Sequence, residues 1–173
     1  DFLPFAAVHV LDDKTQQTRC EAAMAAFGAP YSMLLRELDS KGMYDSAAED
    51  KGKVFVSTEL GGGGTGRAST VAIARRGIRD VLRHAGILAG EIEPRDSVRL
   101  TMPGDDCFIL SEASGMVEPC IDLGGRVKKG DPIARIWPIE RTGIAPTTYR
   151  APMDGLLAAR HFPGLIQIGD CLA

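Results

Sequence analysis

The sequence lacks the features that mark membrane proteins and nucleic-acid-binding proteins. No run approaches the roughly 18–20 apolar residues of a membrane-spanning helix, and no basic segment precedes a short apolar one near the start. Long blocks of one charge sign are also missing, and the formal net charge is -3 over 173 residues. We therefore expect neither a membrane nor a nucleic acid as a partner.

The sequence also lacks a CxxC pair, although it contains four cysteines. Each cysteine stands among apolar neighbours, where small buried hydrophobic residues usually lie. They are Cys20, Cys107, Cys120 and Cys171. This pattern predicts buried, reduced thiols in a cytoplasmic protein.

Both ends of the chain are abrupt. It opens at Asp1 without a methionine and soon enters a strand-like stretch, and it closes at Gly169–Ala173 inside another. We interpret the chain as a fragment or as one piece of a cleaved protein.

The first half alternates strand and helix signals, which is typical of an α/β fold. Thr15 is the expected N-cap of the first helix, and Gly28 is its expected end. The expected strands are 5–11, 31–35 and 54–60, the expected helices are 15–27 and 68–84, and 42–50 reads as a short helical turn.

A polar linker over residues 89–96 separates this half from a region of short β runs. We therefore expect two domains, 1–96 and 97–173. The second contains a quasi-repeat in which Ser114–Ile133 matches Asp154–Leu172, with an offset of 40 residues at the first glycine and 39 at the later two. Such a repeat predicts a small β-sandwich or barrel.

Residues 111–173 resemble the biotinyl/lipoyl barrel-sandwich family, whose two halves carry the same glycine-aspartate turn. That family presents a modified lysine between the halves, whereas this sequence has Trp137–Gly143 without a lysine there. The resemblance implies the fold without the swinging-arm chemistry. A non-catalytic binding or carrier module built on this half is one alternative function.

The run Gly61–Gly66 follows a strand and opens a helix, and it formally satisfies GxGxxG. No second parallel strand ending in an acidic residue follows, as a dinucleotide-binding unit requires. A phosphate loop would need lysine and serine or threonine where Arg67 and Ala68 stand. A nucleotide-binding domain therefore stays an alternative beside a tight strand-to-helix turn, which does not need four glycines.

Glu59 places a carboxylate at the end of an otherwise apolar strand. Burying it costs free energy unless something uses it, and in α/β sheets active groups collect at the carboxyl ends of strands. The alternative is a solvent-facing glutamate or one paired with Arg67 or Arg75. Position alone does not separate the two interpretations.

The segment Thr58-Glu-Leu-Gly61 resembles the one carrying the catalytic glutamate of succinylglutamate desuccinylases and aspartoacylases, which are zinc carboxypeptidase-like hydrolases. Four longer stretches resemble the branch acting on N-alpha-acetyl-diaminobutyrate in ectoine breakdown: 1–6, 42–49, 58–65 and 151–155. The resemblance implies part of a zinc-peptidase-like (phosphorylase/hydrolase-like) α/β domain followed by a small β domain.

The zinc ligands of that family, a His-x-x-Glu pair and a later histidine, are not found in this sequence. The resemblance places them upstream of Asp1, so zinc is the implied cofactor and this chain is expected to supply no ligand. His9, His84 and His161 have no metal-binding spacing. We expect His84 to be a favourable cation at the C-terminal end of a helix. We expect His9 to be an ordinary strand residue, and we leave open that it supports a metal ligand, because its strand borders the implied metal site.

The same resemblance implies roles for four residues. Glu59 would be the general base and acid, and Tyr44 would contact substrate, although an aromatic at that place usually packs. Asp1 would meet a substrate amine, and Arg67 would face a carboxylate or solvent. The implied reaction is hydrolysis of the amide bond of a small N-acyl amino acid, preferably an N-acetyl one, with assembly into a homo-oligomer left open.

Overall fold

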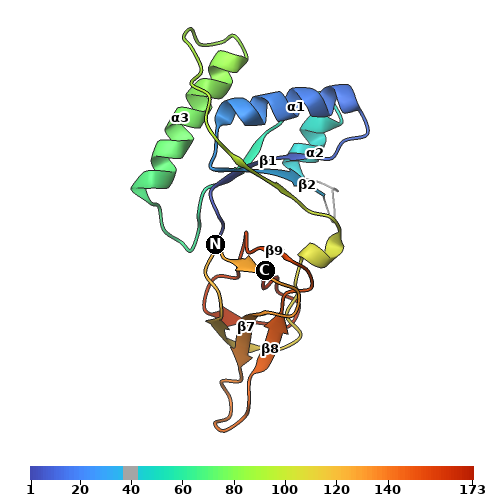
Figure 1. Cartoon of the computed structure of the whole chain (residues 1–173), viewed down its shortest axis with the longest axis vertical. Helices are drawn as coiled ribbons and strands as arrows, with labels where there is room; N and C mark the ends of the chain where they lie inside the picture. Colours follow the sequence, from blue (N-terminus) through green and yellow to red (C-terminus); the bar gives the residue numbers. More distant parts are fainter. Residues whose placement is uncertain (37–42) are drawn as a thin grey trace. The chain divides into compact units, whose positions relative to one another are not determined.

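The computed structural model describes residues 1–36 and 43–173, which form two compact units (Figure 1). One unit is Pro4–Gly104, and the other is Asp1–Leu3 with Asp105–Ala173. The sequence suggested a change of domain at 96/97, but β4 (Val98–Thr101) belongs to the sheet of the first unit because it pairs in parallel with β2 (Tyr31–Leu35). No helix in the described residues has the length and apolar character needed to cross a membrane.

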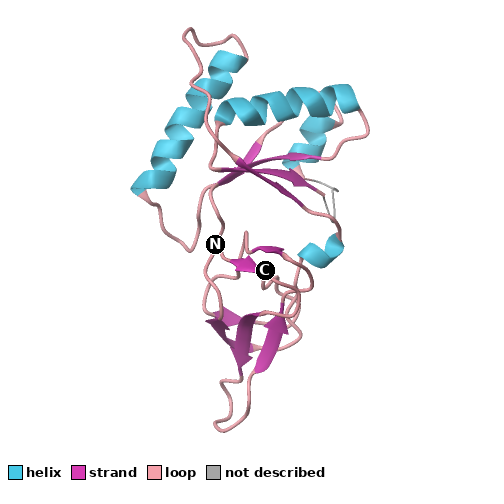
Figure 2. Ribbon diagram, viewed as in Figure 1, coloured by secondary structure: helices cyan, strands magenta, loops and turns pink. Residues whose placement is uncertain are grey.

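The first unit has a four-stranded sheet with the order β3-β1-β2-β4. The strands β1 (Phe5–His9), β2 and β4 are parallel, whereas β3 (Ser57–Glu59) runs antiparallel to β1. Figures 1 and 2 show helix α1 (Lys14–Phe27) lying across this sheet. The core between them consists of Ala6, Val8, Cys20, Met24, Phe27 and Ala29. The mixed α/β class predicted from the sequence is confirmed.

Helix α1 begins and ends at residues with clear physical roles. Asp13, not Thr15, is the N-cap, because its Oδ1 accepts hydrogen bonds from the backbone N–H groups of Thr15 at 2.8 Å and Gln16 at 3.1 Å. Gly28 ends the helix in the left-handed region, with φ 63°. The expected cap at Thr15 is therefore wrong by two residues, because the Asp13 carboxylate caps as well as a hydroxyl does.

Helix α3 (Ala68–His84) packs closely against α1 through a glycine. A Cβ atom added at Gly77 would lie 2.5 Å from ring atoms of Phe27. In an open helix, replacing glycine with alanine stabilises by about 0.5–1 kcal/mol. Here the helices would have to separate, and separation loses contacts in the core.

We therefore expect Gly77→Ala to lower the free energy of unfolding by about 1–2 kcal/mol, because overpacking outweighs the gain in helix propensity. Urea unfolding followed by circular dichroism measures this. Gly66→Ala is the matched control, since a Cβ there meets nothing within 4 Å. A Gly77→Ala protein as stable as the parent would show that α3 has room to shift.

The second unit is built of short strands and loops (Figure 2). One sheet has the order β10-β5-β7-β8, and a two-stranded sheet pairs β6 with β9. Their bounds are β5 Gly115–Pro119, β6 Arg126–Val127, β7 Pro132–Trp137, β8 Thr147–Arg150, β9 Gly155–Leu156 and β10 Leu165–Ile166, after a short 3-10 helix at Asp105–Cys107. Its core consists of Ile133, Ala134, Ile136, Tyr149, Ala151, Ile166 and Leu172.

The two halves of the sequence repeat make reciprocal strand pairings. Val127 of β6 pairs with Gly155 of β9, and Ile166 of β10 pairs with Gly115 of β5. Gly115 corresponds to Gly155 in the repeat, and Val127 corresponds to Ile166. Each half therefore completes the other in the same register.

The glycine-aspartate turns of the repeat are also equivalent. In each, an aspartate Oδ2 accepts a hydrogen bond at 2.9 Å from the backbone N–H three residues earlier, Asp131 from Lys128 and Asp170 from Gln167. The preceding glycines have φ 93° and φ 92°. These left-handed values explain why glycine recurs there.

The four cysteines are free. The sequence suggested that all four are buried, but only one of them is. Cys20 is buried in the first core, Cys107 and Cys120 are half-buried, and Cys171 is exposed. Cys171 lies in an isolated bridge with Leu110 and not within a strand of the packed sheet. Apolar neighbours in the sequence therefore did not guarantee burial.

Candidate functional site

Glu59 is the last residue of β3 and pairs with Phe5, the first residue of β1. The residue is exposed, yet partial burial raises the pKa of its carboxyl. In the described part of the chain, neither Arg67 nor Arg75 forms an ion pair with it. A carboxylate with a raised pKa and an accessible face is suited to accepting a proton.

The surroundings of Glu59 differ from those expected at the end of a parallel strand. The sequence suggested a strand over 54–60, but β3 covers only Ser57–Glu59 and is antiparallel. Its carboxyl end therefore lies beside the amino end of β1. Chain direction depends on pairing between distant segments, and local apolar patterning carries no information about it.

The glycine run after Glu59 is explained by backbone geometry. Gly61, Gly62, Gly63 and Gly64 have φ values of 110°, 139°, 66° and 69°. The expectation that a turn here does not need four glycines is wrong, because all four adopt angles that side chains disfavour. Replacing any of these glycines with alanine would strain the backbone.

This geometry also removes the basis for a nucleotide-binding unit. That unit needs a strand, the loop, a helix and a neighbouring parallel strand. Here α3 is followed by β4, which pairs with β2 at the opposite side of the sheet from β3. Gly61–Gly66 therefore connects β3 to α3 without the βαβ context of a dinucleotide site.

Each of the three expected substrate-binding residues is described by its own contacts within its unit. Tyr44, the first residue of α2 (Tyr44–Glu49), is 82% exposed, and its ring centroid lies 5.5 Å from that of Phe55 in a T-shaped arrangement. Asp1 forms an ion pair with Arg160 in the second unit, at 3.1 Å. Arg67 is exposed at the start of α3, where it makes no side-chain capping bond. Gly42, part of the resembling stretch before Tyr44, lies outside the described residues.

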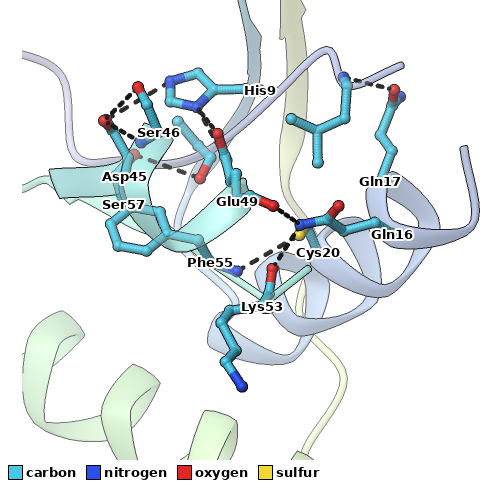
Figure 3. Close-up of polar contacts among 12 residues, drawn as sticks. His9, Gln16, Gln17, Cys20, Asp45, Ser46, Glu49, Lys53, Phe55 and Ser57 are labelled. Atoms are coloured by element: carbon cyan, nitrogen blue, oxygen red, sulfur yellow. Dashed lines mark hydrogen bonds and ion pairs between the residues drawn. The ribbon is translucent and has the colours of Figure 1, made fainter. Parts of the chain in front are cut away.

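Sequence reasoning missed a buried polar cluster beside Tyr44. Figure 3 shows the ring of His9 between the carboxylates of Glu49 and Asp45. His9 Nδ1 lies 3.0 Å from both carboxylate oxygens of Glu49, and Nε2 lies 3.8 Å from Asp45 Oδ2. The spacing of Asp45 and Glu49, one helical turn apart, is the signal that could have indicated a shared partner.

The described residues do not by themselves form a zinc site. No group of three or more histidine, cysteine, aspartate or glutamate side chains among them could hold a metal ion. Both ring nitrogens of His161 lie against backbone carbonyls, those of Cys171 and Leu165, and His84 ends α3.

Comparisons with a family model and with a curated protein agree with each other. Residues 1–85 match the model of the succinylglutamate desuccinylase/aspartoacylase catalytic domain. Over 175 aligned residues the chain is 46% identical to an N-alpha-acetyl-L-2,4-diaminobutyric acid deacetylase of Halomonas elongata, matching 100% of this chain and 51% of that protein. The resemblance predicted from Thr58–Gly61 is confirmed.

Solved structures agree with this match. The product-bound ectoine utilization protein EutE (DoeB) of Ruegeria pomeroyi has a TM-score of 0.96 and 59% identity, covering 99% of this chain and 52% of that one. A succinylglutamate desuccinylase of Silicibacter sp. TM1040 has a TM-score of 0.93 and 56% identity, covering 99% and 52%. The chain thus spans about half the length of these relatives.

Proposed function

We propose that this chain forms part of an enzyme that hydrolyses the amide bond of a small N-acyl amino acid. Its residues 1–85 match the succinylglutamate desuccinylase/aspartoacylase family. The preferred substrate is N-acetyl-diaminobutyrate, in keeping with the deacetylase that is 46% identical. N-succinylglutamate and N-acetylaspartate are the less favoured relatives. The observation that carries the proposal is Glu59, an accessible carboxylate with a raised pKa within the matched segment.

In the proposed reaction Glu59 accepts a proton from the water that attacks the acyl carbonyl carbon. A carbon–oxygen bond forms, and the carbon–nitrogen bond breaks as Glu59 returns the proton to the departing amine. The products are a carboxylic acid and an amino acid with a free amine. The glycines after Glu59 carry no side chains, so substrate can approach the backbone closely there.

We propose that the zinc ligands lie upstream of Asp1, as the family resemblance implies; the described residues offer no group of side chains that fits a zinc site. The working enzyme would then comprise this chain together with further sequence of the kind its longer relatives carry. Zinc bound there would polarise the acyl carbonyl, as metal ions do in hydrolases.

The second unit is proposed to be a lipoyl-like barrel-sandwich that serves the enzyme structurally. Its reciprocal pairings and matching turns support this fold. A carrier role is not supported, because the hairpin between β7 and β8 has Glu140 and Arg141 where that family presents lysine.

A panel of substrates tests the proposal. The full-length protein, with zinc supplied, is expected to release amine fastest from N-acetyl-diaminobutyrate, with kcat/KM about tenfold or more above N-succinylglutamate and N-acetylaspartate, since pocket contacts discriminate by about 1–3 kcal/mol. Amine release is measured directly, with N-acetyl-lysine as the control for a non-specific deacetylase. Hydrolysis of none of the four amides would refute the proposed activity.

A further inference from the structure

Helix α2 is too short to hold its own position. It has six residues, and isolated helices shorter than about 12–15 residues are marginal in water. Its N-cap residue, Met43, makes no side-chain capping bond, and Glu49 is the one residue of the helix that is buried. The placement of α2 therefore depends on what Glu49 contacts.

Glu49 is held by the last residue of β1. His9 is 6% exposed and Glu49 is 8% exposed, so their contact is shielded from water. The two 3.0 Å distances from His9 Nδ1 to the Glu49 carboxylate oxygens allow the ring N–H to donate to the carboxylate. Asp45, one turn earlier, faces the other ring nitrogen at 3.8 Å.

A second residue fixes the carboxyl end of α2 from α1. Gln16 Nε2 donates hydrogen bonds to the backbone carbonyls of Glu49 at 2.8 Å and Lys53 at 2.9 Å. The Glu49 carbonyl ends α2, where it also accepts from the backbone N–H of Gly52 at 2.8 Å, and Lys53 lies four residues further on. His9 and Gln16 together join α2 to the sheet and to α1, as Figure 3 shows.

The position of α2 determines where Tyr44 lies. Its ring meets the edge of Phe55, which is four residues before Glu59. Four residues of extended chain span at most about 14 Å, so Tyr44 lies beside the segment that leads to the proposed base. A shift of α2 would move Tyr44 relative to that segment.

We propose that His9 is a positioning residue, which holds α2 through Glu49 and thereby holds Tyr44 in place for the substrate. The part of this proposal that concerns substrate rests on the proposed function. The part that concerns α2 does not, because it follows from the contacts of Glu49 alone.

Hydrogen exchange of the full-length protein tests the hold on α2. In His9→Phe, which keeps a ring but removes both nitrogens, exchange over residues 43–53 is expected to rise at least tenfold, with α1 and α3 unchanged. Glu49→Leu, which breaks the same contact from the helix side, should do the same. His9→Asn, whose amide can donate from the position of Nδ1, should restore most of the protection. His84→Phe, at the exposed end of α3, is the control.

Steady-state kinetics tests the route through Tyr44. His9→Phe is expected to raise KM for N-acetyl-diaminobutyrate about two- to tenfold with kcat within twofold, as for loss of one substrate contact. Tyr44→Ala should raise KM to a similar extent. In the double variant the two increases should not multiply, because both remove the same contact.

Unchanged exchange over residues 43–53 in both His9→Phe and Glu49→Leu would overturn the proposal, and so would KM increases that multiply in the double variant. Failure of the proposed function would show in the activity assays and not in hydrogen exchange. A protein inactive on every N-acyl amino acid would refute the deacylase assignment, while the exchange measurement would still decide whether His9 holds α2.

Discussion

Replacing Glu59 with glutamine in the full-length protein is expected to lower kcat for N-acetyl-diaminobutyrate by about 10²–10⁴, with KM changed by no more than a few-fold. The amide has nearly the same shape as the carboxylate but cannot accept a proton from water. The fold and the zinc content should be preserved, because Glu59 belongs to neither core and, among the described residues, forms an ion pair with neither Arg67 nor Arg75. Stopped-time assays of amine release, with zinc measured on the same samples, provide the test.

The pH dependence adds a second signature of the same role. Burial raises the pKa of the Glu59 carboxyl, and a general base must be deprotonated to act. The acid limb of kcat/KM should therefore lie above the roughly 4.3 of an ordinary glutamate, with activity falling as pH drops through it. Glu140→Gln, in the β7–β8 hairpin, is the matched control. A Glu59→Gln enzyme that keeps its zinc and works within a few-fold of the parent would make Glu59 a structural residue.

Local signals in the sequence predicted the elements whose limits are set by neighbouring residues. The helix over 68–84 and the strand over 31–35 match α3 and β2 residue for residue. Gly28 as the end of α1 was equally predictable, because a left-handed cap strongly favours glycine. These features depend on periodicity and capping within a few residues.

Features that depend on distant pairing were not predictable in this way. The direction of β3 is set by its pairing with β1 some 50 residues away, between Ser57 and Ala7. The contact of His9 with Glu49 spans 40 residues, and no local spacing in the sequence links the two. Glu59 is a candidate because a carboxylate at the end of an apolar strand is unusual, whereas the proposed role of His9 depends on knowing where α2 packs.

The polar linker also proved to be anchored, through a contact that the sequence did not reveal. Asp80, on α3, is 1% exposed and lies 2.9 Å from Arg83 Nη1 and 2.8 Å from Arg95 Nη1. The Arg95 side chain also passes 3.5 Å from the position of a Cβ at Gly28. Asp80 therefore ties the segment after α3 to the helix pair before the chain enters β4.

Asp80→Asn is expected to lower the free energy of unfolding at neutral pH by about 2–3 kcal/mol. The change leaves two guanidinium groups facing an amide, and breaking a buried ion pair costs roughly 3–5 kcal/mol. The loss here should be smaller because Arg83 and Arg95 are partly exposed and screened by solvent. Urea unfolding measures it. Glu93→Gln is the matched control, since Glu93 pairs with the same Arg95 but is 86% exposed, and should change stability by no more than about 0.5 kcal/mol.

The effect of Asp80→Asn should also depend on pH. Burial alone would raise the pKa of Asp80, but the hydrogen bonds from Arg95 and Arg83 outweigh it and hold the pKa below its usual value. A carboxyl with a depressed pKa contributes stability above its unfolded pKa, about 3.9, and loses it as pH falls through the lower folded pKa. The difference between parent and Asp80→Asn should thus be constant from neutral pH down to about pH 5 and shrink below about pH 4. A difference that stays the same down to pH 2 would show that packing, and not the charge of Asp80, holds Arg83 and Arg95 in place.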